Sequence, residues 1–446
     1  MRKRTPVTVV LVATAVVGVA GVAALGGALL QPGPTPTVAA TDPRAIVVGE
    51  NTASIGVDPD SGHILVVNNT TVDSGMAGGS VSIIDSRTRR VVGTVPVGVN
   101  PGAVTVDART HRAYVLNAGL SVTTSVRRGG TYRSTSTPLP GSVSVLDTRD
   151  GRIVRTLTIG GEPRGLAVDA RTGHLFVADA ARNTVSMFVA DTGVLVRRVA
   201  VGRSPVGIAV DARTGHVFVV NQGSGTVSML DARSSRTVRT IPVGNIPARI
   251  AADPGTGHIF VGNMGSGSVS VLDARSGTVV RTSALGGVPA DVVVDAPQHH
   301  VFVLTQSGNP TGPGGVTMLD AGSGQVVRTV VLGTFAVGIA ADEGRGRVVV
   351  TTGGAIGRDG YPTGRGQAHV LDGGTGHVLR TLAVGLASYN VAVDGRTGQA
   401  FVANSGGPLA AQAASDGLGR VLPFLARRVP RPQSAPASVS VIDVSR

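Results

Sequence analysis

An aspartate that ends a short apolar run recurs eight times along this chain, and this repeat constrains the fold more than any other feature. The basic period is 42 residues, and a glycine precedes each aspartate by nine residues. The eight positions are Asp58, Asp107, Asp169, Asp211, Asp253, Asp295, Asp342 and Asp394. A second aspartate series lies 22 residues before the next repeat's first aspartate, with Val189 in its place in the third repeat. Self-similarity at such a period indicates stacked repeat units.

Each repeat reads as four short strands, which fall at 207–210, 217–220, 227–230 and 238–243 in the fourth repeat. Asp-x-x-x-Gly turns join the first strand to the second, since aspartate bonds its own downstream backbone and glycine tolerates positive φ. With 64 glycines and only 3% aromatic residues, the composition suits valine-rich strands joined by tight turns. The sequence therefore predicts an all-β fold, an eight-bladed β-propeller of four-stranded antiparallel blades, with residues 45–446 as a single domain.

The two ends of this domain predict how the ring closes. The eighth repeat stops after its third strand, and residues 45–49 have the pattern of the missing fourth strand. An unpaired edge in the last blade would expose backbone hydrogen-bonding groups. We therefore expect the N-terminal strand to complete the last blade by pairing with residues 439–442.

Residues 1–44 have the features of an export segment. Residues 2–4 are basic, and an uncharged apolar run of 24 residues follows at 7–30. That run is long enough for a membrane span, and Val38-Ala39-Ala40 is an acceptable cleavage site, so a signal peptide and an uncleaved N-terminal membrane anchor both stay open. Residues 31–44 form a Pro/Thr/Ala-rich linker. Either alternative predicts an exported protein, secreted or anchored on the outer side of the cytoplasmic membrane.

Two segments carry a family resemblance. The stretches 217–231 and 259–273, with Phe-Val followed by Asn, then Gly-Ser-Gly and a Val-Ser run ending in Asp, resemble the YVTN β-propeller repeats of surface-layer and periplasmic proteins. The tyrosine of that motif survives only as Tyr114. Members of the family are commonly seven-bladed, whereas eight repeats are present here. The resemblance implies an extracytoplasmic binding or surface protein.

Nearly all length variation falls in the loop between the second and third strands. The predicted insertions occupy 69–80, 118–140, 306–315, 353–366 and 405–437. These loops and the loops between repeats emerge on one face, here called the crown face, and loops on a rigid scaffold commonly carry binding sites. The second insertion reads as a hairpin that carries three arginines, Arg127, Arg128 and Arg133, which are candidate ligand-binding residues.

A second candidate site is the crown-side mouth of the central channel. Four residues before the first-strand aspartate most repeats have a small residue, but three have Arg249, Asp291 or Asn390, and Tyr389 is adjacent to the last. Two interpretations stay open: a ligand site, or an ion pair between Arg249 and Asp291 of neighbouring blades.

Other patterns do not predict chemistry. His63, His174, His216, His258 and His300 share one repeat position, but equivalent atoms of neighbouring blades are about 10 Å apart, too far to share an ion with metal–nitrogen bonds of about 2 Å. We therefore predict turn residues rather than metal ligands, with no catalytic residue and no cofactor assigned.

The leading functional prediction is a noncatalytic binding or cell-surface interaction scaffold, a monomer with an unknown extracellular ligand or protein partner. The first alternative is binding of anionic polymers, either cell-wall polyanion or single-stranded nucleic acid, because the net charge is +13 and stays +10 without residues 1–40. The second alternative is a propeller enzyme of lactonase or lyase type. A membrane contact through the N-terminal anchor would be compatible with all three.

Overall fold

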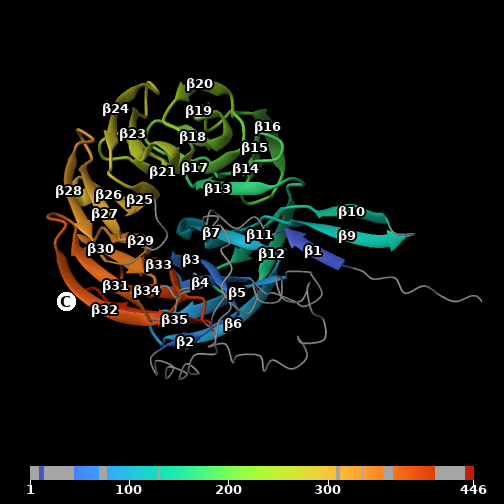
Figure 1. Ribbon diagram of the computed structural model, residues 1–446, viewed down its shortest axis with the longest axis horizontal. Helices are drawn as coiled ribbons and strands as arrows, with labels where there is room; N and C mark the ends of the chain where they lie inside the picture. Colours follow the sequence, from blue (N-terminus) through green and yellow to red (C-terminus); the bar gives the residue numbers. More distant parts are fainter. Residues whose placement is uncertain are drawn as a thin grey trace, which may run out of the picture.

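The computed structural model describes residues 10–14, 45–69, 78–128, 131–307, 312–333, 335–354, 365–406 and 437–445. Over these residues, eight four-stranded antiparallel sheets follow one another around a ring (Figure 1). The innermost strands of neighbouring sheets pack against each other, so that they surround the central channel. The predicted eight-bladed β-propeller is confirmed.

Strands take the same place in every blade, from the channel outwards. The first, innermost strands are β3 (Thr52–Asp58), β7 (Pro101–Asp107), β13 (Pro163–Asp169), β17 (Pro205–Asp211), β21 (Pro247–Asp253), β25 (Val288–Asp295), β29 (Ala336–Asp342) and β33 (Ser388–Asp394). The second strands are β4 (His63–Asn69), β8 (Arg112–Asn117), β14 (His174–Asp179), β18 (His216–Asn221), β22 (His258–Asn263), β26 (His300–Gln306), β30 (Arg347–Thr352) and β34 (Gln399–Asn404).

The third strands are β5 (Gly79–Asp85), β11 (Ser142–Asp147), β15 (Thr184–Val189), β19 (Thr226–Asp231), β23 (Ser268–Asp273), β27 (Gly314–Asp320), β31 (Arg365–Asp372) and β35 (Ser438–Asp443). The fourth, outermost strands are β6 (Arg90–Val97), β12 (Ile153–Thr158), β16 (Leu195–Ala200), β20 (Thr237–Pro242), β24 (Val279–Ala284), β28 (Val326–Val331), β32 (Val378–Leu386) and β2 (Ile46–Val47). Short 3-10 helices occur at η1 (Ala108–Thr110), η2 (Gln222–Ser224), η3 (Met264–Ser266) and η4 (Ala296–Gln298).

The ring closes through the N-terminal strand, as predicted. Ile46 pairs with Val439 and Val47 with Ser438, and the amide of Val48 donates to the carbonyl of Ala437 at 3.1 Å. Strand β2 thereby becomes the fourth strand of the last blade, next to blade one in the ring (Figure 1). Residues nearly 400 positions apart in the sequence are thus joined in one sheet.

The hydrophobic core lies between blades. The second strands bury one large aromatic ring in most blades, at Tyr114, Phe176, Phe218, Phe260, Phe302 and Phe401. Phe218, for example, belongs to a cluster that also contains Ile259 and Val261 of the next blade. Each fully buried side chain of this size contributes about 1.5–3 kcal/mol through removal of apolar surface from water. Blade-to-blade packing therefore stabilises the ring.

The repeated glycine and asparagine are a matched pair. A Cβ atom added to Gly244 would lie 2.6 Å from the Cγ atom of Asn263, so only glycine fits there. Asn263 in turn donates from Nδ2 to the hydroxyls of Ser268 and Ser270, at 3.2 and 3.0 Å. The same close approach recurs at Gly98 with Asn117, Gly202 with Asn221 and Gly385 with Asn404. Packing of a buried asparagine explains why this spacing repeats.

The predicted Asp-x-x-x-Gly turns form as expected on the face opposite the crown, here called the turn face. Asp211 accepts a hydrogen bond from the Arg213 amide at 3.1 Å and another from the Thr214 hydroxyl at 2.7 Å. Gly215 closes the turn with a φ of 73°. Where these bonds form, the first-strand aspartate therefore caps the turn; Asp295 of blade six is an exception, because no side chain donates to its carboxylate.

One additional sheet lies outside the blades. It contains β1 (Val10–Thr14), β9 (Leu120–Arg128) and β10 (Thr131–Leu139). Strands β9 and β10 form the predicted hairpin, and β1 pairs with β9, with Val10 opposite Ser125. The rest of the predicted signal or anchor and the whole of the linker lie outside the described residues. So do residues 70–77, 308–311, 355–364 and 407–436 of the predicted insertions 69–80, 306–315, 353–366 and 405–437. Among the described residues there is no helix with the length and apolar character needed to span a bilayer.

Candidate functional site

A β-bulge marks the crown-side end of every innermost strand. In blade five the pairing of β21 with β22 skips one residue between Pro247 and Arg249, so Ala248 has no partner on the second strand. The same shift occurs in the other seven blades. Bulges leave one residue unpaired and redirect its neighbours. The candidate residues Arg249, Asp291 and Asn390 all directly follow the bulged residue.

The carbonyl of the bulged residue faces the preceding blade. A Cβ atom added to Gly207 would lie 3.2 Å from the carbonyl oxygen of Ala248, and one added to Gly165 would lie 2.7 Å from that of Val206. At Gly338 the corresponding distance to the carbonyl oxygen of Tyr389 is 2.6 Å. This close approach explains why three repeats have glycine at the position that follows the bulge.

Two blades place a hydrogen-bond donor against this carbonyl instead. The Nε group of Arg249 donates to the carbonyl of Ala290 at 2.7 Å, and the Nδ2 group of Asn390 donates to that of Ala53 at 2.7 Å. These bonds join blade five to blade six and blade eight to blade one. Arg249 is nevertheless exposed, and its Nη groups make no hydrogen bond or ion pair with another described residue, so they can bind a ligand.

Asp291 is the exception at this position, because a carboxylate takes the place of a small residue or a donor. Its Oδ1 atom accepts a hydrogen bond from the Val292 amide at 2.9 Å. Burial raises the pKa of Asp291, while the positive charge of Arg249 and the Val292 amide partly oppose that rise. The two side chains do not reach ion-pair distance, so the predicted ion-pair alternative is not formed. A desolvated carboxyl group beside a cation is an arrangement typical of acid–base sites.

Tyr389 and Asn390 extend the site along the ring. They lie on β33 of blade eight, which packs against β29, and β29 packs against the β25 strand that carries Asp291. Tyr389 is 37% exposed, and burial of the rest of its ring raises the pKa of its phenol. The four candidate residues of the channel mouth therefore lie at one level on an arc of four consecutive blades.

The hairpin arginines belong to a different part of the molecule. In the register of β9 with β10, Arg127 lies opposite Tyr132, Arg128 opposite Thr131 and Arg133 opposite Val126. This sheet shares no strand pairing with the innermost strands of blades five to eight among the described residues. The structure therefore brings the arginines together in one hairpin but does not join them to the channel mouth.

The repeated histidines connect blades. The Nδ1 atom of His216 lies 2.9 Å from the carbonyl oxygen of Ala274 in the next blade, and that of His258 lies 2.9 Å from the carbonyl oxygen of Ala321. His63, His174 and His300 make the equivalent contact with Thr148, Ala232 and Gly373. Within the described part of the chain, no group of three or more His, Cys, Asp or Glu side chains is placed to hold a metal ion. The sequence predicted that these histidines lie at turns, but it did not predict this hydrogen bond between blades. The partner is a backbone carbonyl, which any residue can supply, so the residue pattern does not reveal it.

Comparison with known proteins shows the fold. No protein-family model matches the chain, and no curated protein sequence matches it either. Among solved structures, dihydro-heme d1 dehydrogenase NirN in complex with DHE is similar with a TM-score of 0.54 and 15% identity, over 79% of this chain and 76% of that one. Hydrazine synthase of Kuenenia stuttgartiensis is similar with a TM-score of 0.44 and 17% identity, over 60% of this chain and 80% of that one.

These comparisons correct one prediction. The expected noncatalytic binding or cell-surface scaffold is contradicted, because a solved structure that is similar over 79% of this chain is that of a dehydrogenase. The propeller fold lacks a function of its own, and function resides in the groups placed on it. At 15% identity the likeness shows the fold alone, so an enzymatic role of this chain is a proposal.

Proposed function

We propose that this propeller is an enzyme of lyase or lactonase type that binds a small carboxylate-bearing substrate at the crown-side mouth of its channel. The observation that carries the proposal is the desolvated Asp291 carboxyl beside the exposed guanidinium of Arg249. No other blade has an acid at this position of its innermost strand. YVTN-type repeat membership and export, predicted from the sequence, belong to the same proposal.

The two side chains have complementary roles. The Nη groups of Arg249 bind the substrate carboxylate, because a guanidinium pairs with a carboxylate through two parallel hydrogen bonds. Neutralising that carboxylate acidifies the adjacent carbon–hydrogen bond. Asp291, whose raised pKa makes it a stronger base than an ordinary aspartate, accepts the proton. In an elimination the electron pair of the broken carbon–hydrogen bond forms the new double bond, and the group on the next carbon leaves.

The same pair serves the hydrolytic variant. For a lactone, Asp291 removes a proton from water, the hydroxide attacks the carbonyl carbon, the ring carbon–oxygen bond breaks, and the proton held by Asp291 passes to the departing alkoxide oxygen. Tyr389 provides a phenol on the same arc, and its raised pKa keeps that phenol protonated. The described mouth residues include no histidine to ligate a haem iron, so the ligand of the dehydrogenase neighbour is not part of the proposal.

The experiment is an activity screen with two substrate classes, uronate oligosaccharides for elimination and lactones that carry a free carboxylate for hydrolysis. The full chain should turn over a member of one class. Asp291→Asn should lower kcat by about 100-fold or more, the usual range for loss of a general base. Arg249→Met should raise KM and also lower kcat, because it removes the group that binds the carboxylate and acidifies the adjacent carbon–hydrogen bond.

Asp295→Asn is the matched control, because it changes a carboxyl of the same strand at the opposite end of the channel. Its activity should equal that of the unchanged protein. Absence of turnover with both substrate classes, or full activity of Asp291→Asn, would refute the proposal.

A further inference from the structure

An arginine on the outermost strand fills a slot on the next blade. It occurs in six blades, at Arg155, Arg197, Arg239, Arg281, Arg328 and Arg380. A Cβ atom added to the next blade's turn glycine would lie 2.6–3.3 Å from the arginine Cδ atom at Gly193, Gly277, Gly324 and Gly376. The aliphatic part of the arginine therefore covers that turn, as long basic side chains commonly do with apolar surface.

The guanidinium groups reach acceptors of the same neighbouring blade. Arg197 donates from Nη1 to the carbonyl of Ser234 at 3.4 Å, and Arg380 donates from Nη2 to the carbonyl of Asp443 at 2.5 Å. The equivalent arginines thus make apolar contacts in four blades and hydrogen bonds to a backbone carbonyl in two others. The slot on the neighbouring blade therefore fits a long side chain that ends in a planar cationic group.

Blade one leaves its slot empty. Gly93 lies opposite Ile83 in the pairing of β5 with β6, as Arg239 lies opposite Met229 in blade four. A Cβ atom added to Gly93 would meet no atom within 4 Å. The turn glycine of blade two, Gly151, packs against the end of the Ile83 side chain and not against an arginine.

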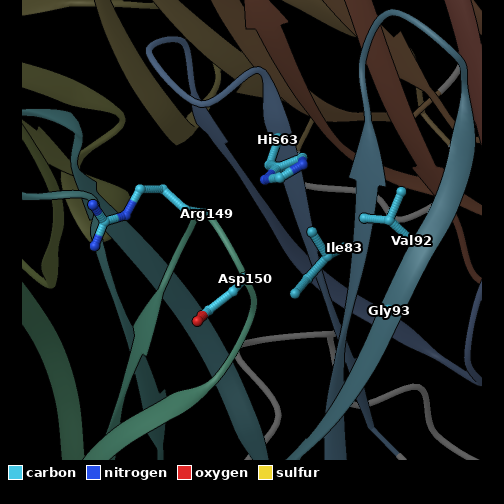
Figure 2. Close-up of a pocket in the computed structure, with 6 residues that line it drawn as sticks. All are labelled: His63, Ile83, Val92, Gly93, Arg149 and Asp150. Carbon is cyan, nitrogen blue, oxygen red and sulfur yellow. The ribbon is translucent and has the colours of Figure 1, made fainter.

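The missing arginine leaves a solvent-open cavity between blades one and two. Its volume is about 260 Å³, and it is lined by His63, Ile83, Val92, Gly93, Arg149 and Asp150 (Figure 2). Figure 2 shows the turn with Arg149 and Asp150 on one side and Ile83 and Val92 on the other. The Arg149 guanidinium extends away from the cavity, held by Asp147 through Nε and Nη2 at 3.0 and 2.7 Å. It is therefore not the missing occupant.

We infer that this cavity is a binding site for an arginine side chain of a partner polypeptide. Six blades of the same chain supply the template, because each places an arginine at the equivalent point. Asp150 corresponds in the repeat to Ser234, whose carbonyl accepts the Arg197 guanidinium. Blade two therefore offers a carboxylate in addition to the backbone acceptor. Its side chain is 53% exposed. Oδ1 accepts a hydrogen bond from the Arg152 amide at 3.0 Å and Oδ2 lies 3.9 Å from the Arg152 guanidinium, which leaves the carboxylate with capacity to bind a second cation.

A polypeptide suits the site better than a free cation. Ile83 and Val92 form an apolar wall that the three methylene groups of an arginine would cover. Val92 itself is 57% exposed on the outermost strand, so a partner chain would also bury surface beside the slot. Arginine is among the residue types enriched at the energetic centres of protein interfaces.

The test uses the full chain and three blocked tripeptides, Gly-Arg-Gly, Gly-Lys-Gly and Gly-citrulline-Gly, titrated by NMR. The arginine peptide should saturate with a Kd on the order of millimolar, as expected for one exposed side chain. The lysine and citrulline peptides should bind at least fivefold more weakly, because one lacks the flat fork and the other the charge. Asp150→Asn should weaken the arginine peptide severalfold.

Gly93→Arg should fill the slot from within, abolish peptide binding and raise Tm. Gly78→Arg is the matched control, because it adds the same charge at a glycine that also has open space, in a crown-face loop. It should change neither binding nor Tm. Three results would overturn the inference: equal binding of all three peptides, unchanged peptide binding by Gly93→Arg, or binding of the arginine peptide that Asp150→Asn does not weaken. If Gly93→Arg does not fold, the Asp150→Asn variant provides the test.

Discussion

Asn390 of the last blade donates a hydrogen bond from its side chain to the backbone carbonyl of Ala53 in the first blade, at 2.7 Å. This bond closes the channel side of the ring, while pairing of Ile46 with Val439 closes the rim. The junction between the last and first blades is thus held at both ends. Its strength is open to direct measurement.

Strand β2 should contribute strongly to stability through Ile46, which is 9% exposed. Ile46→Ala should lower the free energy of unfolding by about 2–4 kcal/mol, because it leaves a cavity between the last and first blades. Val47→Ala in the same strand is the control, since Val47 is 58% exposed and should change stability by less than about 0.5 kcal/mol. Urea denaturation measures both, and equal effects would contradict closure through this strand.

Removal of the Arg249 charge should raise the pKa of Asp291 further. Burial already raises that pKa, and Arg249 opposes the rise, so Arg249→Met should shift the titration of the carboxyl upwards. Carbon-13 NMR of labelled aspartate measures the pKa. Arg203→Met, which removes an exposed arginine of a crown-face loop, should leave it unchanged. A downward shift in Arg249→Met would show that Arg249 does not act on Asp291.

Asp295 should make the protein less stable as pH rises. It is fully buried, and no side chain donates a hydrogen bond to either carboxylate oxygen. Burial raises its pKa from 3.8 to about 6; the Gln298 amide opposes this, and the charges of Glu343, Asp342 and Asp372 add to it. Because the folded-state pKa exceeds the unfolded one, ionisation costs stability between about pH 4 and 6, up to about 3 kcal/mol above pH 6.

Asp295→Asn should therefore raise Tm at pH 8 and remove most of the decline between pH 4 and 6. Thermal unfolding across this range, compared with the unchanged protein, provides the measurement. Asp211→Asn is the control. Asp211 accepts hydrogen bonds from the Arg213 amide and the Thr214 hydroxyl, so this substitution should lower the stability of the protein at pH 8. A flat pH profile in the unchanged protein would rule out a raised pKa at Asp295.

Gln298→Thr should restore the missing donor to Asp295. The same type of 3-10 turn in blade two has Thr110, whose hydroxyl donates to Asp107 at 2.9 Å. A threonine at position 298 should make the equivalent bond and lower the pKa of Asp295, because a hydrogen bond stabilises the charged form. NMR titration of the Asp295 carboxyl would detect the shift, and an unchanged pKa would show that the turns differ.

The sequence by itself determined the architecture, since each local signal agreed with the repeat. Asp211, Thr214 and Gly215 specify a turn through bonds within five residues, and the spacing of Gly244 and Asn263 reflects one packed pair. Even the closing strand was predictable, because residues 45–49 fill a place that the repeat count leaves empty. In each of these features the contacting residues stand at constant positions within the 42-residue repeat, so the sequence pattern identifies both of them.

Only the tertiary structure decided what the departures from the repeat do. Arg249 and Asp291 have opposite charges at equivalent positions, yet Arg249 bonds to the carbonyl of Ala290 and leaves Asp291 without an ion pair. Gly93 looks like an ordinary substitution in the sequence, but it opens a cavity because the arginine it replaces fills a slot on the next blade. Such properties depend on side chains of neighbouring blades and on burial, and neither is encoded within a single repeat.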